Sequence, residues 1–338
     1  MGFIHCIPLS SQRTGSLDSN VAEAENAVYV INVSKDGTAE FTMIKDALDS
    51  VDNGNSNRVV INIGPGEYEE KITVERYKSY ITFYGDPNDK PVITYGGTAA
   101  DYGTVDSATL IVEADYFVGA NIIVENSAPR PDGKRKGAQA VAIRISGDLA
   151  TFYNCEFIGF QDTVCDDKGR HFFKDCYIEG TVDFVFGEGR SLYLNTELHV
   201  IPGDPVAVIV AHARKNQDGE GGYSFVHCKV AGRGANAYLA RAWMEAGRVV
   251  YSYCQLDDVV NPEGWSDNFK SHLQKTVYFG EYNNDGPGAD TSKRVSYAKQ
   301  LSDDEAQDFI SLEYIDAAKW LLPPPSADNV QFVSIINR

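Results

Sequence analysis

Two carboxylates occur in short, largely apolar segments of this chain. Asp162 lies in GFQDTV, and Asp183 follows further along the chain in GTVDFVFG. An unpaired buried carboxylate is costly, so an acid between Val182 and Phe184 requires a reason. It either occupies a turn, where Asp is common, or takes part in chemistry. These segments alone leave both interpretations open.

The chemistry that such residues could perform is acyl transfer. Two neighbouring carboxyl groups do not both ionise easily, so one becomes a proton donor and the other a nucleophile or base. Gln139 and Gln161 could donate amide N–H groups to an oxyanion. Arg241 is a candidate cation for the buried carboxylate. Trp243, two positions further, would lie on the same face of a strand.

Other catalytic signatures are absent from the sequence. There is no G-x-S-x-G elbow, no H-E-x-x-H pair and no glycine-rich phosphate loop. The six histidines are scattered, and His171, His199 and His227 fall in or beside predicted strands. We expect these three to be packing or surface residues rather than metal ligands.

A repeat determines where these residues would lie. Six segments align without gaps: 117–124, 152–159, 173–180, 193–200, 225–232 and 250–256. At the position of Cys155 stand Asn121, Cys176, Thr196, Cys228 and Cys254, at irregular intervals along the chain. Each segment alternates apolar with polar or small residues and is followed by turn residues.

This irregular period predicts an all-β parallel solenoid in which the matched small side chains point inward. Residues one coil apart stack at about 4.8 Å. The interval from Asp162 to Asp183 equals that from Cys155 to Cys176, so the two acids would face each other on adjacent coils. The two glutamines are separated by nearly the same interval, which would place them on adjacent coils beside the acids.

The six cysteines do not form a disulfide scaffold in a chain of 338 residues, and no C-x-x-C pair is present. We expect most of them to be buried positions of the ladder, since free Cys packs as a small hydrophobe. Disulfides between neighbouring coils, or between Cys165 and Cys176, remain alternatives.

Helices are expected at both ends, where a solenoid exposes its core. The segment 41–51 places apolar residues on one helical face. Ser302 and Glu305 form a capping box that opens a helical segment, and the run from Pro323 ends it. We predict one domain over residues 27–322, with tails at 1–26 and 323–338.

Composition and charge narrow the class of protein. The chain is 43% hydrophobic, as expected for a globular protein, and it has no apolar stretch long enough to span a membrane. Its net charge of −18 argues against nucleic acid or an anionic membrane as a partner. No signal peptide is visible at the N-terminus.

Several segments resemble the signature segments of pectin methylesterases: GFQDTV, YIEGTVDFVFG, GPGEYEEKITV and LARAW. The resemblance extends over nearly all of residues 27–322, and is greatest to pollen-allergen members from the amaranth and goosefoot group. It implies a right-handed parallel β-helix that removes methyl esters from cell-wall homogalacturonan, giving pectate and methanol. It also implies two catalytic Asp residues and neither metal nor cofactor.

The resemblance implies a role for each matching residue. Asp183 would be the nucleophile, and Asp162 would protonate the departing methanol and then activate water. Gln139 and Gln161 would stabilise the oxyanion, while Arg241 would hold Asp183. The implied substrate contacts are Thr109, Gln139, Phe186, Arg241 and Trp243. The family also implies a secreted, monomeric cell-wall enzyme that a proteinaceous pectin methylesterase inhibitor could bind.

The sequence departs from the family pattern at three places. The usual Gly-Arg-Pro-Trp is Ala-Arg-Ala-Trp over residues 240–243, and His212 stands where Gln is common. The frequent second Trp is missing after Trp265, which is followed by Ser-Asp-Asn. We expect these changes to affect substrate preference, since none removes a proposed catalytic atom.

Two other functions are compatible with a solenoid. A galacturonase would also use paired carboxylates, and a lyase would use a calcium cluster with a basic residue. The glutamine pair argues against both, because amide donors suit acyl chemistry. An inactive carbohydrate-binding relative is the other alternative, although all five proposed catalytic positions hold the expected residue types.

Overall fold

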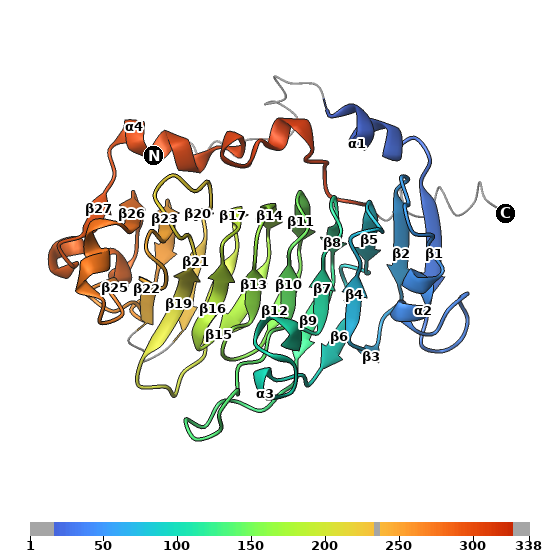
Figure 1. The fold of residues 1–338 in the computed structure, drawn as a ribbon, viewed down its shortest axis with the longest axis horizontal. Coiled ribbons are helices and arrows are strands. Elements are labelled where there is room, and N and C mark those ends of the chain that lie inside the picture. The colour runs from blue at the N-terminus through green and yellow to red at the C-terminus, as the bar shows by residue number, and fades with distance from the viewer. Residues whose placement is uncertain (1–16, 233–236, 327–338) are drawn as a thin grey trace.

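The chain winds into a right-handed parallel β-helix, as predicted (Figure 1). The computed structural model describes residues 17–232 and 237–326. Eight successive coils each contribute one strand to each of three parallel sheets, which we call the first, second and third sheet, and the first sheet has three further strands at its ends. In the middle of the solenoid, Ser146 and Asp167 lie level on adjacent coils and are 21 residues apart, which is the length of one coil there.

The first sheet has eleven strands. They are β1 (Tyr29–Val33), β2 (Val59–Ile63), β5 (Ile81–Tyr84), β8 (Val118–Ala120), β11 (Ala150–Tyr153), β14 (Arg170–Lys174), β17 (Arg190–Leu194), β20 (Gly222–Val226), β23 (Arg248–Ser252), β26 (Tyr278–Tyr282) and β27 (Ala298–Gln300).

The second and third sheets have eight strands each. The second comprises β4 (Ile72–Val74), β7 (Leu110–Val112), β10 (Ile143–Ile145), β13 (Val164–Asp166), β16 (Val182–Gly187), β19 (Ala207–His212), β22 (Ala237–Arg241) and β25 (Trp265–Ser266). The third comprises β3 (Glu67–Glu69), β6 (Val92–Tyr95), β9 (Ile123–Asn126), β12 (Glu156–Ile158), β15 (Tyr177–Gly180), β18 (Glu197–Val200), β21 (Lys229–Gly232) and β24 (Gln255–Leu256).

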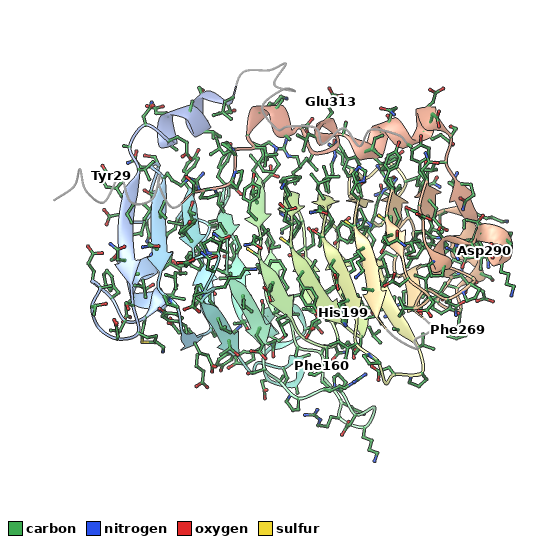
Figure 2. The ribbon with its side chains drawn as sticks, turned by 180° about the vertical axis from the view of Figure 1, so that it is seen from behind. Tyr29, Phe160, His199, Phe269, Asp290 and Glu313 are labelled. Atoms are coloured by element: carbon green, nitrogen blue, oxygen red, sulfur yellow. The ribbon has the colours of Figure 1, made fainter. Side chains whose placement is uncertain are left out.

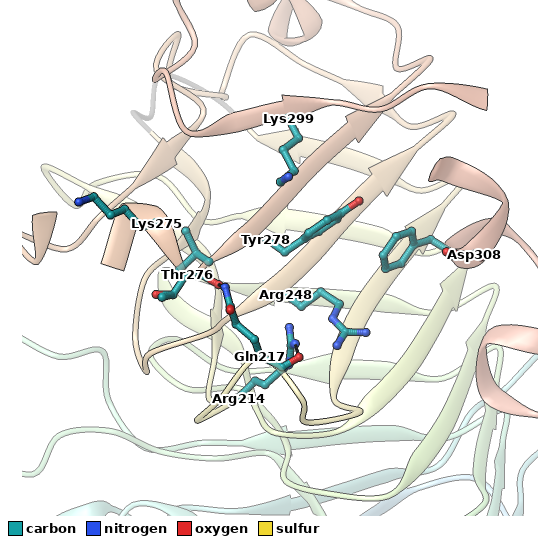
Figure 3. Close-up of a pocket in the computed structure, with 10 residues that line it drawn as sticks. Arg214, Gln217, Arg248, Lys275, Thr276, Tyr278, Lys299 and Asp308 are labelled. Atoms are coloured by element: carbon teal, nitrogen blue, oxygen red, sulfur yellow. Dashed lines mark hydrogen bonds between the residues drawn. The ribbon is translucent and has the colours of Figure 1, made fainter. Parts of the chain in front are cut away.

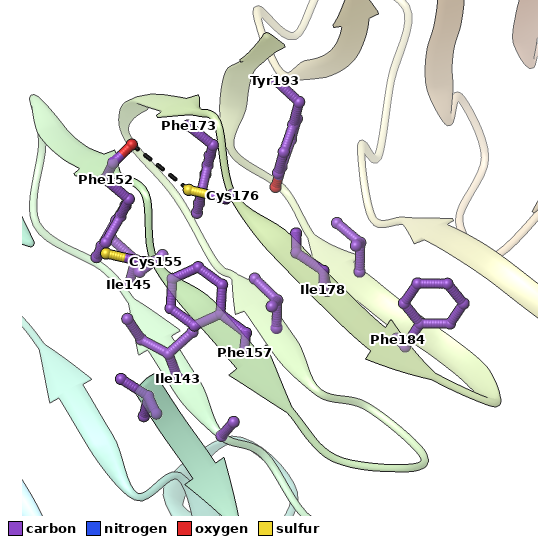
Figure 4. Packing of buried hydrophobic residues seen from close by; sticks show 14 of the residues in the cluster. Ile143, Ile145, Phe152, Cys155, Phe157, Phe173, Cys176, Ile178, Phe184 and Tyr193 are labelled. Carbon is purple, nitrogen blue, oxygen red and sulfur yellow. Dashed lines mark hydrogen bonds between the residues drawn. The ribbon is translucent and has the colours of Figure 1, made fainter. Parts of the chain in front are cut away.

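Stacked aromatic rings fill the interior along the first sheet. The ring of Phe173 lies 4.9 Å from that of Phe152 and 4.4 Å from that of Tyr193, one coil away on each side (Figure 4). The stack continues through Phe225 and Tyr251 at 4.6 Å per step. The coil spacing thus matches the distance at which aromatic rings stack, and each ring adds apolar contact to its neighbours.

The ladder cysteines Cys155, Cys176, Cys228 and Cys254 lie inside the solenoid, as expected, whereas Cys165 is buried in a separate cluster on the second sheet. Cys155, Cys165, Cys176, Cys228 and Cys254 are all buried and free, so a Cys165–Cys176 disulfide or a disulfide between coils is wrong for these five. Cys6 lies outside the described residues.

One predicted member of this ladder is wrong. Because Glu156 pairs with Ile123, Cys155 lies level with Ile122 rather than with Asn121. Asn121 instead lies level with Asn154, whose Nδ2 donates to the Asn121 Oδ1 atom at 2.9 Å.

Asn121 belongs to a second ladder that turns the chain from the first sheet into the third. Its members all have positive φ: Asn121, Asn154, Asp175, Asn195, His227, Tyr253 and Asn283. Asn and Asp tolerate this left-handed conformation better than other non-glycine residues, which explains why they make up five of these seven positions.

The N-terminal end of the solenoid is covered by α2 (Ile44–Asp49), a shorter helix than the predicted 41–51. Its first N–H groups lack a side-chain cap from Met43. Glu70 supplies one instead, because its carboxylate accepts from the backbone N–H groups of Ile44 at 3.0 Å and Lys45 at 2.8 Å. The helix N-terminus is thus satisfied by a residue of the second coil.

The C-terminal helical segment begins with α4 (Asp303–Ile310) and the predicted Ser302–Glu305 capping box. It continues through the 3₁₀ turns η6 (Leu312–Ile315) and η7 (Ala317–Lys319) across the outside of the first sheet (Figure 1). Part of the expected N-terminal tail is helical as well. Helix α1 (Ser19–Ala24) packs into the same outer cluster, and the Asp18 N–H donates to the Lys319 carbonyl at 2.7 Å.

The remaining helical elements lie in the connections between strands. They are α3 (Ala99–Tyr102), η2 (Val105–Ser107), η3 (Ser271–Lys275), η4 (Pro287–Ala289) and η5 (Thr291–Lys293). No helix in the described ranges has the length and apolar character needed to cross a membrane.

Candidate active site

A β-bulge places Asp183 in the second sheet. Between the pairs Val182–Val208 and Val185–Val210 the register shifts, so β16 has one residue more than β19. Asp183 lies within this irregularity and has a φ of 52°. A bulge redirects the side chain at the inserted position, as bulges often do beside active sites.

The residues around the bulge explain how it fits. Phe184 points into the core and is fully buried, while Asp183 remains 6% exposed. A Cβ atom at Gly180 would lie 2.2 Å from the Cβ of Phe184 and 2.7 Å from the carbonyl of Phe160. Glycine is therefore required at position 180 for the close approach of these segments.

Asp162 lies opposite Asp183 on the preceding coil, as predicted. Val164 pairs with Val185, and the Asp162 N–H donates to the Val182 carbonyl at 3.0 Å. Asp162 also has a positive φ, 68°. The turn interpretation therefore holds for the backbone of Asp162, whereas Asp183 lies in strand β16, and it accounts for the burial of neither acid.

Arg241 at the end of β22 pairs with Asp183, also as expected. Its Nε donates to the Asp183 Oδ1 atom at 2.7 Å, and its Nη2 donates to Oδ2. The Asp183 side chain is only 8% exposed and that of Arg241 is 20% exposed, so the pair is largely withdrawn from water. Such a bidentate pair fixes the carboxylate in one orientation.

The two acids differ in how readily they ionise. Burial, and then the negative charge of Asp183, raise the pKa of Asp162 well above its ordinary value, against an opposing effect of Arg241. Burial also raises the pKa of Asp183, but two opposing contributions of Arg241, a hydrogen bond and its charge, act directly on that carboxylate. Of the two acids, Asp162 is thus the one that more readily retains a proton, and Asp183 is the one whose anion is better stabilised.

Gln139 and Gln161 lie on adjacent coils, because the Ala140 N–H donates to the Gln161 carbonyl at 3.2 Å. Both residues are partly exposed. Their position at the entry to β10 and β13 places them on the same side of the solenoid as the two acids.

Phe186 and Trp243 extend the apolar surface near the acids. Phe186 is partly exposed and packs against a small cluster on the second sheet that contains Cys165. Trp243 is 43% exposed, and the Arg241 guanidinium lies 4.9 Å from its ring centroid. Lys270 approaches the same ring at 5.4 Å and donates to the Trp243 carbonyl at 2.9 Å.

The two alanines beside Arg241 have a structural consequence. Ala240 and Ala242 are fully buried, and the Ala242 N–H donates to the Ser266 carbonyl at 2.8 Å. A proline at position 242 has no N–H and could not form this bond. The departure from the usual Gly-Arg-Pro-Trp therefore ties the Arg241 segment to the last residue of β25.

Two residues shortly after β25, Asn268 and Phe269, were not predicted from the sequence. The Asn268 Oδ1 atom accepts from Arg241 Nη1 at 3.0 Å, so Asn268 fixes the side of the guanidinium that faces away from Asp183. Phe269 is fully exposed, has a φ of 58° and lies at the outer edge of the molecule (Figure 2). The sequence departs from the family pattern in this stretch, because the second Trp is missing after Trp265. No sequence pattern indicates that Asn268 would contact Arg241.

The predicted substrate contact of Thr109 does not agree with the position of its side chain. Its side chain is fully buried, and its hydroxyl donates to the Glu125 carbonyl at 2.8 Å. Thr163, two coils further along, bonds the carbonyl of Glu179 in the same way at 2.8 Å. Thr109 is therefore part of a repeated internal link between the second and third sheets, and its side chain does not reach the surface.

His212 likewise lies away from the two acids. It is fully buried against Tyr223, and its Nε2 contacts the Gly189 carbonyl at 3.2 Å. Burial lowers the pKa of His212 to about 4, so the ring is neutral near pH 7. Across the described ranges, no group of three or more His, Cys, Asp or Glu side chains could hold a metal ion.

Comparison with known proteins gives a consistent result. The sequence model of the Pectinesterase family matches residues 30–318. Putative pectinesterase 63 of Arabidopsis thaliana is 58% identical over 295 residues, which cover 87% of each chain. Pectinesterase 2 of Olea europaea is 55% identical over 313 residues, covering 92% of this chain and 85% of that protein.

Solved structures share the fold. The pectin methylesterase from carrot superposes with a TM-score of 0.82 at 29% identity, covering 87% of this chain and 97% of that one. A pectin methylesterase in complex with a hexasaccharide superposes with a TM-score of 0.75 at 25% identity, covering 88% and 100% of the two chains.

Proposed function

The chain belongs to the pectinesterase family and hydrolyses the methyl esters of pectin, and we propose that it does so through Asp183 as nucleophile and Asp162 as acid and base. The observation that carries this assignment is the asymmetry of the pair. Arg241 forms a bidentate pair with Asp183 alone, while the Asp162 side chain accepts no hydrogen bond from a described residue and has a pKa raised well above its ordinary value.

The first step forms an acyl-enzyme. A carboxylate oxygen of Asp183 attacks the C6 carbonyl of a methyl galacturonate, and the carbonyl electrons move to oxygen. The amide groups of Gln139 and Gln161 donate hydrogen bonds to that oxyanion. When the intermediate collapses, the bond to the methoxy group breaks, the Asp162 carboxyl gives it a proton, and methanol leaves.

The second step returns the enzyme to its starting state. The Asp162 carboxylate takes a proton from water, and the resulting hydroxide attacks the acyl carbon. The bond to Asp183 breaks and Asp183 leaves as a carboxylate. The products are a galacturonate carboxyl group and the original pair, with Asp162 protonated again.

The substrate assignment extends to the polymer. A related pectin methylesterase has been solved in complex with a hexasaccharide. We assign the homogalacturonan chain to the surface of the second sheet beside Phe186 and Trp243, because exposed aromatic rings offer apolar faces to sugar rings. The cell wall is the proposed place of action, with the enzyme secreted and monomeric and a proteinaceous inhibitor as a proposed partner of this surface.

The roles of the two acids are separable with a better leaving group. Asp162→Asn should lower methanol release from methyl esters about 10²–10⁴-fold, since no acid protonates the leaving group. The loss should shrink with a trifluoroethyl ester, whose alcohol leaves without protonation. Asp183→Asn should be inactive with both esters.

The opposite pattern, recovery of Asp183→Asn with the activated ester, would exchange the two roles. The released alcohol, methanol or trifluoroethanol, is measured together with new reducing ends and unsaturated product. Depolymerisation without methanol would instead indicate a galacturonase or a lyase.

A further inference from the structure

A second concave site lies outside the Asp162–Asp183 site and shares no residue with it. It has a volume of about 370 Å³, at the small end of the range for ligand pockets. We call it the cation pocket, and its lining residues are Arg214, Gln217, Arg248, Lys275, Thr276, Val277, Tyr278, Lys299, Asp308 and Phe309. These residues come from the segment after β19, from β23, from η3 and the start of β26, from β27 and from α4.

The charge of the cation pocket is opposite to that of the protein. Four of its ten lining residues are cationic and one, Asp308, is acidic, although the whole chain carries 48 acidic and 30 basic residues. The four cations form no ion pair with any residue that the structure describes; they are Arg214, Arg248, Lys275 and Lys299. Figure 3 shows Arg214 and Arg248 close together, with Lys275 and Lys299 apart from each other around them.

The cation at the base of the pocket is incompletely satisfied. Arg214 is only 5% exposed, and its Nε has no hydrogen-bond partner among the described residues. Its other guanidinium nitrogens donate only to carbonyl oxygens, of Ala246 at 3.2 Å and of Gln217. Burial and then the charge of Arg248 lower the pKa of Arg214, against smaller opposing effects of Tyr314 and of the Asp218 carboxylate.

A second buried donor lies beside Arg248. The hydroxyl of Tyr314 has no hydrogen-bond partner within the described residues. A Cβ atom at Gly222 would lie 2.4 Å from this hydroxyl and 2.9 Å from the Arg248 Cδ, so both groups pack over that glycine. Unpaired buried donors are rare in folded proteins and call for an explanation.

We propose that the cation pocket binds the carboxylates of de-esterified galacturonate chains, the product of the enzyme's own reaction. Arg214 and Arg248 would take one carboxylate, and Lys275 and Lys299 would take those of neighbouring sugars. This ligand rests on the pectinesterase activity, which turns neutral ester groups into a run of anions. A net charge of −18 repels such a run, so retaining it requires a local cluster of cations.

The cation pocket is connected to the catalytic site through one loop. Arg241 and Trp243 precede Ala246, whose N–H donates to the Arg214 carbonyl at 3.0 Å. Thr276, which lines the pocket, donates from its hydroxyl to the carbonyl of Glu245 in the same loop. A product chain held in the pocket would therefore lie beside Glu245 and Ala246, at one end of the loop that begins with Arg241 of the catalytic site.

The experiment counts bound product molecules. Trigalacturonate without methyl groups is titrated calorimetrically at low ionic strength, where charge attraction is least screened. Wild-type protein should bind two molecules per chain, one at the Asp162–Asp183 site and one in the cation pocket. The double variant Lys275→Glu/Lys299→Glu changes two exposed side chains and should bind one.

A matched control makes the same charge change elsewhere. Lys168→Glu/Lys293→Glu alters two exposed lysines outside the pocket and should still bind two molecules. Methanol release from a fully methylated trimer should be unchanged in both double variants. That measurement reads the esterase function separately from the cation pocket.

Three results would overturn the proposal. The first is a single bound trigalacturonate in wild-type protein, and the second is retention of both molecules by the Lys275→Glu/Lys299→Glu variant. The third is displacement of the second trigalacturonate by inorganic phosphate at equal concentration, which would identify a site for small anions in general. Failure of wild-type protein to release methanol would refute the function instead.

Discussion

Arg241→Gln is the most informative single change at the catalytic site. It removes the cation that forms a bidentate pair with Asp183 and leaves two buried carboxyl groups together. Without this cation the pKa values of both acids rise, because Arg241 opposes the effect of burial on each. Asp183 must be ionised to attack and Asp162 must be protonated to donate. Both limbs of the pH–rate profile should therefore move to higher pH.

The size of the shift follows from the geometry. An arginine in contact with a carboxylate changes its pKa by about 1–3 units, and one unit corresponds to about 1.4 kcal/mol. Below the acid limb, kcat/KM should therefore fall about 10–1,000-fold. Near the new pH optimum kcat/KM should fall by less, since only the orientation of Asp183 is impaired there. Arg241→Lys keeps the charge without the bidentate pair, so its limbs should move less.

The assay is initial methanol release from a short methylated oligogalacturonate across the pH range, with thermal unfolding as a check on folding. Arg170→Gln is the matched control. It breaks another bidentate pair, in which Arg170 contacts Asp148 at 2.6 and 3.2 Å on the first sheet. Its pH–rate profile should match that of wild type. An equal loss at every pH in Arg241→Gln, with unmoved limbs, would refute this reasoning and leave Arg241 only a role in substrate binding.

Three further predictions concern other parts of the structure. Asn268→Ala removes the side-chain oxygen that accepts a hydrogen bond from Arg241. It should lower kcat/KM about tenfold with little change in unfolding free energy, because a hydrogen bond to a charged group contributes about 1.5 kcal/mol. An unchanged kcat/KM would exclude a positioning role for Asn268. His212 has a pKa lowered from 6.5 to about 4, so the native state loses stability as pH falls through that interval. This loss of unfolding free energy, about 3 kcal/mol at most, should be missing in His212→Gln when denaturant unfolding is measured between pH 7 and pH 4. The same pH dependence in His212→Gln and wild type would contradict the burial argument. Phe173→Ala interrupts the aromatic stack and should cost about 3–5 kcal/mol by chemical denaturation, and a cost below about 1 kcal/mol would mean that the neighbouring rings close the gap.

The sequence by itself determined the solenoid and the pairing of the two acids. Strand alternation and turn residues recur once per coil, and that period depends on local backbone preferences that a linear sequence displays. The interval between Asp162 and Asp183 equals the coil length, so their juxtaposition could be predicted. The prediction that placed Asn121 level with Cys155 was wrong by one position. Asn121 lies level with Asn154, 33 residues further along, because the register of two strands depends on which backbone groups pair and not on the sequence interval alone.

Only the tertiary structure decided which way individual side chains point. The bulge turns Asp183 outward although strict alternation would not predict it, and the internal link from Thr109 to Glu125 takes that hydroxyl away from the surface. Asn268 acquires its partner across 27 residues. These contacts join residues from different coils, and their energies depend on distances and burial that no local pattern encodes. The cation pocket is the extreme case, since its four positive charges come from four separate segments that meet only when the chain is wound.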